Sequence, residues 1–126
     1  MNERHKKGRL GEQEAMLHLM KRGYTLLEHN WRSGHLELDI IAEYWGQIVF
    51  VEVKTRSNGD YIVPSEIVSF AQQQRLRRAA THYLAQRRLM DRSFRFDLIT
   101  LEGAAPPFVL HHYRNVFHAT SSEFSI

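Results

Sequence analysis

Residues 36–56 read LELDIIAEYWGQIVFVEVKTR, and they carry the clearest secondary-structure signal in the chain. It holds two runs rich in isoleucine, valine, leucine and phenylalanine, residues 36–44 and 47–55, joined by the short Trp45-Gly46 connection. Runs of this length and composition are typical of buried β-strands, and so short a connection is typical of a hairpin. The stretch therefore predicts two neighbouring, well-buried strands near the middle of the chain.

The segments on either side of the hairpin predict a mixed α/β fold. In addition to the hairpin we expect a helix at residues 9–22, a strand at 24–31, a loop at 56–63, a helix that opens at 64–66, and strands at 94–101 and 108–113. Ser65 can cap the second helix, whose apolar stripe includes Leu76, Ala79 and Tyr83. The expected order is helix, three strands, helix and one or two strands, with a mixed central sheet flanked by helices.

Length and composition limit the classes of protein to consider. The 126 residues, with 43% hydrophobic and 25% charged side chains, fit one globular domain spanning 1–126. The absence of cysteine excludes disulfides, thiolate zinc sites and thiol nucleophiles. No apolar run reaches the length of about 18 residues that a membrane span needs, so we expect a cytoplasmic protein without a membrane partner.

The basic residues indicate a polyanionic partner. The net charge is +3, and the 17 basic residues comprise 13 arginines and 4 lysines. Arginine forms bidentate contacts with phosphates, so this bias favours nucleic acid, although a surplus of surface arginine without a binding role gives the same composition.

Three charged residues lie within the two apolar strands of the hairpin. Asp39 is on the first strand, and Glu52 and Lys54 share one face of the second. An unpaired buried charge costs several kcal/mol, so each must be paired, bound to a metal or close to solvent. A structural ion pair between Lys54 and one carboxylate would explain two of these residues. It leaves the charge of the other carboxylate uncompensated.

A divalent cation would compensate two carboxylates that lie close together. Carboxylates repel each other, and a cation relieves the repulsion by accepting oxygen ligands from both. A nearby lysine can then orient an attacking water. This combination is suited to metal-assisted hydrolysis of a phosphodiester.

Each helix adds one polar residue to an apolar stripe. Glu12 projects on the same face as Met16, Leu19 and Met20, and Gln72 projects on the apolar face of the second helix. Glu12 is either a third acid turned toward the sheet or a structural group that reaches solvent. For Gln72 we favour a side chain that reaches solvent.

The spacing of these acids and the lysine resembles a known nuclease signature. Asp39 followed by Glu52-Val53-Lys54 is similar to the D…ExK pattern of the PD-(D/E)XK nuclease superfamily. Further motifs resemble the YraN family of bacterial, predicted endonuclease-like proteins, over residues 8–117: Gly11-Glu12, Gly23-Tyr24, Asn30-Trp31-Arg32, Glu37-Leu38-Asp39, Glu52-Val53-Lys54-Thr55-Arg56 and Arg95-Phe96-Asp97. The resemblance implies a restriction-endonuclease-like core.

The resemblance also implies roles for individual residues. Asp39 and Glu52 would be ligands of Mg²⁺ or Mn²⁺, with the Val53 carbonyl as a third ligand. Lys54 would position or activate the attacking water, and Glu12 would be an accessory acid. The implied activity is that of a metal-dependent DNA endonuclease.

The sequence departs from the family pattern at two positions. Leu36 precedes Glu37 where the family usually has glycine, and Gln72 stands where it commonly has lysine. We assign accessory roles to Glu37 and Gln72. Asp97 lies on a later strand, where a hydrogen-bonded structural acid is expected.

The second helix supplies the expected contacts to nucleic acid. Residues 72–90 contain no acidic residue, and Arg75 and Arg78 lie off the apolar stripe, while Arg56 follows the Glu52-Val53-Lys54 motif. Without a base-reading motif, we expect recognition of DNA structure more than of sequence. No histidine spacing is typical of a zinc site.

Two alternatives to a nuclease remain. One is a module of the same fold that binds nucleic acid or a partner protein without turnover. The other is a Holliday-junction resolvase, which would act as a homodimer to place two sites on paired strands.

Overall fold

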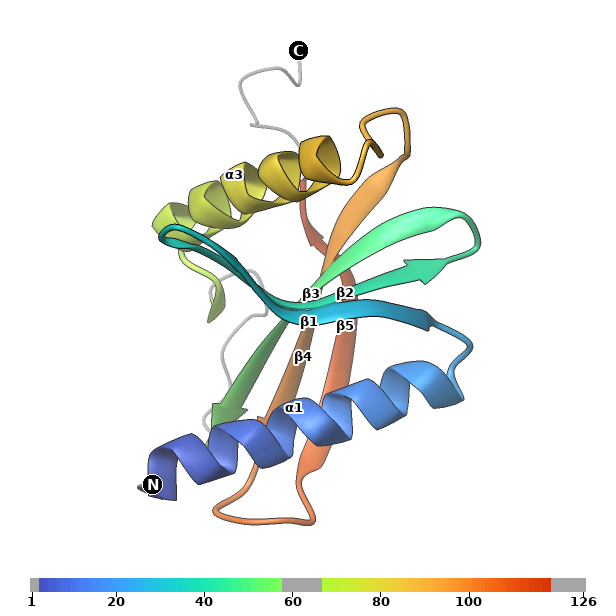
Figure 1. Ribbon diagram of the computed structural model, residues 1–126. Helices are drawn as coiled ribbons and strands as arrows, with labels where there is room; N and C mark the ends of the chain where they lie inside the picture. The colour runs from blue at the N-terminus through green and yellow to red at the C-terminus, as the bar shows by residue number, and fades with distance from the viewer. Residues whose placement is uncertain (1–2, 58–66, 119–126) are drawn as a thin grey trace.

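A five-stranded sheet lies between two helices (Figure 1). The structure is a computed structural model that describes residues 3–57 and 67–118. Its elements in chain order are α1 (Glu3–Lys21), β1 (Thr25–Ser33), β2 (Leu36–Tyr44), β3 (Gln47–Arg56), α3 (Phe70–Gln86), β4 (Phe94–Glu102) and β5 (Val109–Phe117). The predicted order of elements and the mixed α/β class are confirmed.

The strands lie in the sheet in chain order, β1-β2-β3-β4-β5. The first three form an antiparallel meander, β4 runs parallel to β3, and β5 is antiparallel to β4. The predicted tight hairpin is present, because Tyr44 pairs with Gln47 across Trp45 and Gly46. Both turn residues have positive φ (52° and 81°), as the mirror-image turns favoured in hairpins require.

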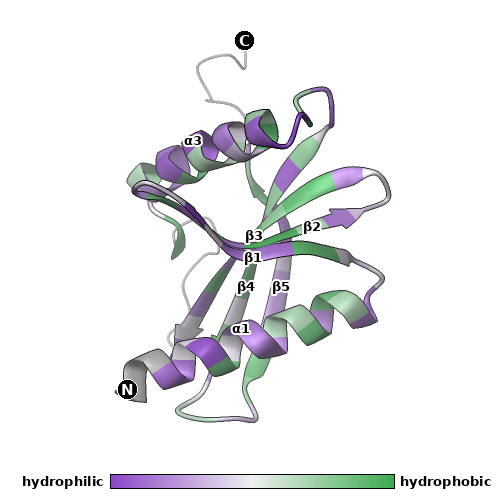
Figure 2. Cartoon of the chain, in the orientation of Figure 1, coloured by the Kyte–Doolittle hydropathy of each residue, from purple (hydrophilic) through white to green (hydrophobic). Residues whose placement is uncertain are grey.

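The helices cover opposite faces of the sheet, so the sheet is buried on both sides. On the α1 face, Ala15 and Leu19 pack against a cluster that includes Ile40, Val51 and Ile99. A second cluster, on the α3 face, consists of side chains from α3 and the strands, among them Leu76, Ala80, Tyr83, Phe50 and Leu98. Figure 2 shows hydrophobic residues concentrated in the strands between the two helices.

The first helix differs from the prediction at its start and on one face. It begins at Glu3 instead of residue 9. Met20, predicted to face inward with Met16 and Leu19, has 50% of its surface exposed. The buried stripe is narrower than the sequence projection, because α1 contacts the sheet along one line through Ala15 and Leu19.

The second long helix begins later than predicted. Ser69 is extended (φ −63°, ψ 159°) and its side chain accepts a hydrogen bond from the Gln72 amide, so this serine caps α3. Most of the predicted loop at 56–63 and the predicted cap at Ser65 lie outside the described residues. Of the described part, Arg56 is still in β3 and Ser57 has left the strand. In the described ranges, neither helix is long and apolar enough to cross a membrane.

Candidate functional site

The candidate site lies where β2 and β3 separate. Their ladder ends at the pair Ile40–Val51, whereas β3 continues to pair with β4 as far as Arg56. Asp39, which precedes Ile40 on β2, accepts a hydrogen bond from the Val53 amide through Oδ2 at 2.9 Å. The carboxylate therefore takes the place of the missing strand partner, and Figure 1 shows the β1–β2 hairpin turning away toward the N-terminal end of α3.

Glu52 lies beside Asp39 and is 9% exposed. Its Oε2 is 3.1 Å from Lys54 Nζ and also accepts a hydrogen bond from Gln72 Nε2. Burial, and after it the charge of Asp39, raises the pKa of Glu52 to about 8, although Lys54 acts in the opposite direction. The two carboxylates thus interact unfavourably when both are ionised, as the sequence predicted for this pair.

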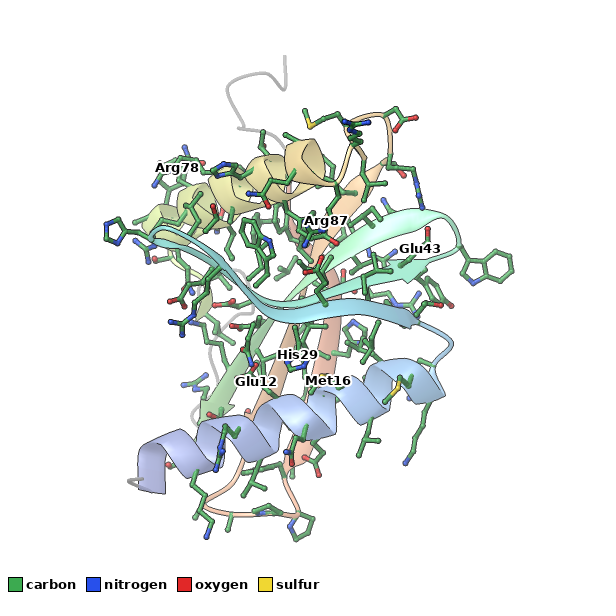
Figure 3. The ribbon with its side chains drawn as sticks, viewed as in Figure 1. Glu12, Met16, His29, Glu43, Arg78 and Arg87 are labelled. Carbon is green, nitrogen blue, oxygen red and sulfur yellow. The ribbon has the colours of Figure 1, made fainter. Side chains whose placement is uncertain are left out.

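Glu12 approaches the pair from the α1 face. Burial, with a smaller contribution from the charge of Asp39, raises the pKa of Glu12, while His29 opposes the shift. Its Oε1 is buried and finds no hydrogen-bond partner among the described residues. Figure 3 shows Glu12 and His29 side by side between α1 and the sheet. Glu12 is therefore turned toward the sheet and does not reach solvent as a satisfied surface group.

Gln72 corrects one interpretation of the sequence. The expectation from the sequence is a side chain that reaches solvent although it projects on the apolar face, but Gln72 is half-buried and donates to Glu52. The first turn of α3 faces the end of β3, and for this reason residue 72 lies over the carboxylate. Gln72 thus contacts the candidate site directly.

A cavity of about 300 Å³ opens over the carboxylates. Its walls come from the start of β2, the end of β3 and the first turns of α3: His35, Leu36, Glu37, Asp39, Glu52, Gln72, Arg75 and Leu76. Half of the ten predicted site residues line this one cavity. Both departures from the family pattern, Leu36 and Gln72, also lie in its wall.

The other five predicted residues, Glu12, Val53, Lys54, Arg56 and Arg78, do not line this cavity, and Glu37 lines it at the rim. Arg56 is the last residue of β3, paired with Glu102 of β4. Arg78 is exposed on the outer side of α3, where Figure 3 labels it. Glu37, at the rim, is 3.7 Å from Arg32 Nε in an exposed ion pair. In the described residues, no three His, Cys, Asp or Glu side chains are spaced to enclose a metal ion.

Asp97 is a structural acid, as predicted. Both of its oxygens are hydrogen-bonded: Arg95 donates at 2.9 Å and His112 Nε2 lies at 2.9 Å, while the Asn115 amide donates at 3.0 Å. Burial alone would raise the pKa of Asp97, but these hydrogen bonds hold it below its usual value. The acid is 1% exposed and faces away from the cavity over Glu52, on the side covered by Tyr24.

Sequence reasoning misses the partners of Asp97. It assigns no role to His112, yet this ring lies between Asp97 and His18 Nε2, which is 3.1 Å from His112 Nδ1. The three residues come from three separate elements. No local spacing in the sequence signals this contact.

Comparison with known proteins identifies the family. The model of the uncharacterised protein family UPF0102 matches residues 11–101, which include the candidate site and Asp97. The chain belongs to the UPF0102 family. The resemblance to the YraN family noted in the sequence is thereby confirmed at the level of this family.

Relatives in the UPF0102 family cover most of this chain. A UPF0102 protein of Phocaeicola vulgatus is 36% identical over 118 residues, 94% of this chain and 97% of the relative. One from Bacteroides thetaiotaomicron is 39% identical over 118 residues, with the same coverage. Another, from Oleidesulfovibrio alaskensis, is 48% identical over 101 residues, 79% of this chain, and the match spans half of that relative's length.

Proposed function

We propose that this UPF0102 protein is a metal-dependent DNA endonuclease with a restriction-endonuclease-like core of the PD-(D/E)XK type. The observation behind the proposal is the carboxylate pair Asp39 and Glu52, which is held together at the divergence of β2 and β3 with Lys54 beside it. Two close carboxylates, of which Glu52 is buried and is compensated only in part by Lys54, are unfavourable, and this supports a ligand that both acids bind.

The donor set fits a hard divalent cation. Carboxylate oxygens are preferred ligands of Mg²⁺ and Mn²⁺, and the pKa of Glu52, raised by burial and Asp39, is what a cation between the two acids would lower. Asp39, Glu52 and the Val53 carbonyl would hold the ion. When bound, it supplies positive charge that stabilises the developing negative charge on the phosphate.

Lys54 has the position required to orient the attacking water. Its ammonium lies 3.1 Å from Glu52, so it is held at the acid pair and keeps further protons for hydrogen bonds. The water attacks phosphorus, and the leaving oxygen departs on the opposite side without a covalent enzyme intermediate. Glu12, half-buried near Asp39, adds negative charge and acts as an accessory acid.

DNA would approach across the cavity between β2 and α3. Arg75 lines this cavity, and Arg78 is exposed one turn further along α3. Both guanidinium groups can contact phosphates, and contacts of this kind favour recognition of backbone and shape. Arg56, at the end of β3, extends the same basic surface.

The test is Mn²⁺-dependent cleavage of single-stranded, duplex, flap and four-way-junction DNAs. The wild type and Lys54→Ala are compared, with Lys21→Ala as a control at the far end of α1. We expect cleavage by the wild type and by Lys21→Ala that Lys54→Ala lacks. Equal cleavage by all three, or binding without cleavage throughout the panel, contradicts the proposal.

One observation favours a second candidate, a binding module without turnover. Gln72 donates a hydrogen bond to Glu52. Gln72 stands at the position where the family resemblance leads us to expect lysine. If this contact replaces a catalytic group, Gln72→Lys should create cleavage that the wild type lacks. Cleavage by the wild type itself would exclude this candidate.

A further inference from the structure

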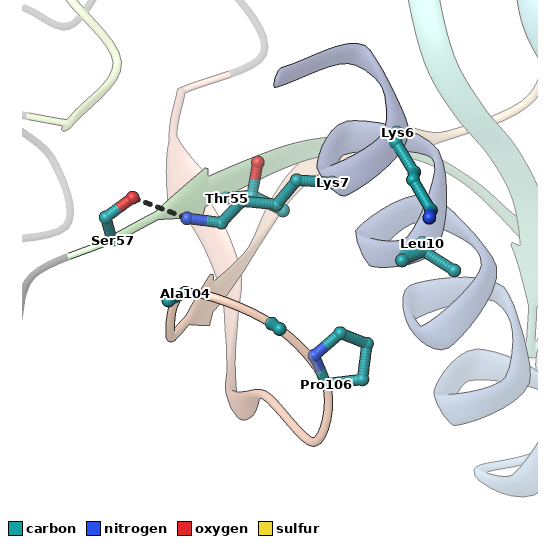
Figure 4. A pocket seen from close by; sticks show the side chains of 8 residues that line it. Lys6, Lys7, Leu10, Thr55, Ser57, Ala104 and Pro106 are labelled. Carbon is teal, nitrogen blue, oxygen red and sulfur yellow. Dashed lines mark hydrogen bonds between the residues drawn. The ribbon is translucent and has the colours of Figure 1, made fainter. Parts of the chain in front are cut away.

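A second cavity, of about 630 Å³, lies beyond the C-terminal end of β3. Its wall includes Lys6, Lys7 and Leu10 of α1, Thr55 and Ser57 at the end of β3, and Pro106 from the β4–β5 connection (Figure 4). We call this cavity the lysine pocket. Its lining is separate from that of the cavity over Asp39 and Glu52, since the two have no described residue in common.

The lysine pocket begins one residue after Lys54, on the other face of the sheet. Side chains alternate along a strand, so Lys54 lies on the α3 face with Glu52, and Thr55 lies on the α1 face. Close packing at Gly11 confirms the second placement, because a Cβ there would overlap the Thr55 methyl group. A strand of nucleic acid that passes the end of β3 would therefore meet both sites in succession.

The lining of the lysine pocket combines positive charge with hydroxyl groups. Lys7 is half-buried and donates to Ser57 Oγ at 2.6 Å, which leaves two of its three ammonium protons for a ligand. Lys6 is exposed beside it. Among the described side chains, those of residues 6–57 and 67–118, no carboxylate lines the pocket. Three of the chain's four lysines thus lie at this end of β3, in a protein whose other basic residues are mostly arginines.

The opposite wall of the lysine pocket is apolar. Leu10, Ala104 and Pro106 contribute no charged or hydroxyl group, and Figure 4 shows the loop with Ala104 and Pro106 facing α1 across the cavity. A nucleotide is complementary to these two walls, because it has an anionic phosphate at one end and the carbon-rich faces of the sugar and base at the other. The volume is sufficient for one such unit.

We propose that the lysine pocket binds one phosphate-bearing nucleotide of the DNA strand that the carboxylate site cleaves. The proposal rests on the proposed function for the identity of the strand. Lys6 and Lys7 contact the phosphate, and the apolar wall contacts the sugar and base. The phosphate is either an internal one of the backbone or the terminal phosphate of a 5′ end, and the pocket's chemistry is the same for both.

The test measures affinity for labelled single-stranded DNA at several salt concentrations, with Ca²⁺ instead of Mn²⁺ to prevent cleavage. The association constant K falls as salt rises. The variant Lys6→Ala/Lys7→Ala should make the slope of log K against log salt less steep, by about 0.7 for each phosphate that it no longer neutralises. Lys21→Ala, which removes a lysine charge elsewhere on α1, should keep more of the wild-type slope. A double variant with the wild-type slope overturns the proposal.

A variant of the apolar wall provides an independent check that leaves α1 intact. Ala105→Asp introduces a negative charge into the lysine pocket, and we expect it to weaken binding at least tenfold. An affinity equal to that of the wild type would contradict the pocket as a DNA contact. Urea unfolding of each variant establishes that a loss of binding does not reflect a loss of folding.

Oligonucleotides with and without a 5′-phosphate distinguish the two sources of the phosphate. A wild-type preference for the phosphorylated strand that the double lysine variant lacks assigns the pocket to a strand end. A reduced slope without such a preference assigns it to an internal phosphate. Both outcomes support the proposal.

Failure of this proposal can be told apart from failure of the nuclease proposal. If the wild type cleaves DNA but the double lysine variant retains the wild-type slope, the lysine pocket is wrong and the nuclease stands. If the slope changes but no DNA in the panel is cleaved, the pocket stands as a DNA contact and hydrolysis is wrong.

Discussion

Two buried carboxylates on neighbouring strands differ in how far the protein compensates them. Asp97 on β4 has its hydrogen-bonding capacity met by Arg95, His112 and the Asn115 amide, and its pKa is low. Glu52 on β3 lies beside Asp39, and burial together with that neighbour raises its pKa to about 8. The same chemical group is thus stabilised as an anion on one strand and destabilised on the next.

This difference separates a structural acid from a candidate ligand. A carboxylate whose partners come from the protein itself needs nothing further, and removing it leaves those partners unpaired. A carboxylate held against another one has a raised free energy until a proton or a cation compensates it. The contrast between Asp97 and Glu52 therefore predicts opposite effects of neutralising the two acids.

Neutralising Asp97 should give the largest effect. Asp97→Asn leaves the Arg95 guanidinium buried without its anion, so we expect the free energy of unfolding to fall by about 3–5 kcal/mol. Urea unfolding at pH 7 measures the change. A loss below about 1 kcal/mol would show that Asp97 is not the structural acid of this pair.

Neutralising Glu52 should have the opposite sign. The folded state holds more protons than the unfolded state between the ordinary pKa of 4.5 and about 8, so the metal-free wild type loses stability as pH rises through this window. Glu52→Gln removes this loss and should unfold with a free energy higher by about 1–3 kcal/mol at pH 8, and less at pH 5.

The control for Glu52→Gln is Glu37→Gln, which neutralises an exposed acid at the rim of the same cavity. It should change the free energy of unfolding by less than about 0.5 kcal/mol at either pH. Equal behaviour of the two variants, or a Glu52→Gln protein less stable than the wild type at pH 8, would contradict the account of Glu52.

Two glycines of α1 test how closely the helix that carries Glu12 is fixed. A Cβ at Gly11 would overlap the Thr55 side chain, so Gly11→Ala should lower the free energy of unfolding by about 1–3 kcal/mol. Gly8 has no atom near its Cβ position, and Gly8→Ala should raise stability by about 0.5–1 kcal/mol. Thermal unfolding of both variants checks the pair, and a stabilising Gly11→Ala would show that α1 is not held at this contact.

The smallest effect concerns the arginines near the carboxylate site. Arg75→Ala/Arg78→Ala should make the slope of log K against log salt for duplex DNA less steep, by about 0.9 for each phosphate left without its arginine. Stability should not change, because both side chains are exposed. An unaltered slope would remove both residues from the DNA-binding surface.

Local patterns are sufficient to predict most elements of the fold. The hairpin of β2 and β3 follows from its apolar runs and short turn, and the candidate acids follow from charges inside those runs. α3 begins at Phe70 after the cap Ser69, whereas Pro64 and Ser65, which resemble a helix start as strongly, lie outside the described residues. The predicted inward position of Met20 is wrong because a helical projection does not show how narrow the contact with the sheet is.

The details of the candidate site depend on tertiary contacts that the sequence does not encode locally. The hydrogen bond from the Val53 amide to Asp39 exists because β2 pairs with β3 only from Ile40 onward, and no residue pattern marks the start of that pairing. The contact of Gln72 with Glu52 depends on where α3 crosses the sheet. For the same reason the sequence does not predict His112 as the partner of Asp97.

Calorimetric titration of Mn²⁺ into the metal-free wild type, Asp39→Asn and Glu37→Gln tests whether the acid pair Asp39 and Glu52, which Lys54 compensates only in part, binds a cation. We predict that the wild type and Glu37→Gln bind one ion per chain, and that Asp39→Asn loses at least tenfold in affinity. Asp39→Asn with the affinity of the wild type would contradict the assignment of Asp39 and Glu52 as a metal site.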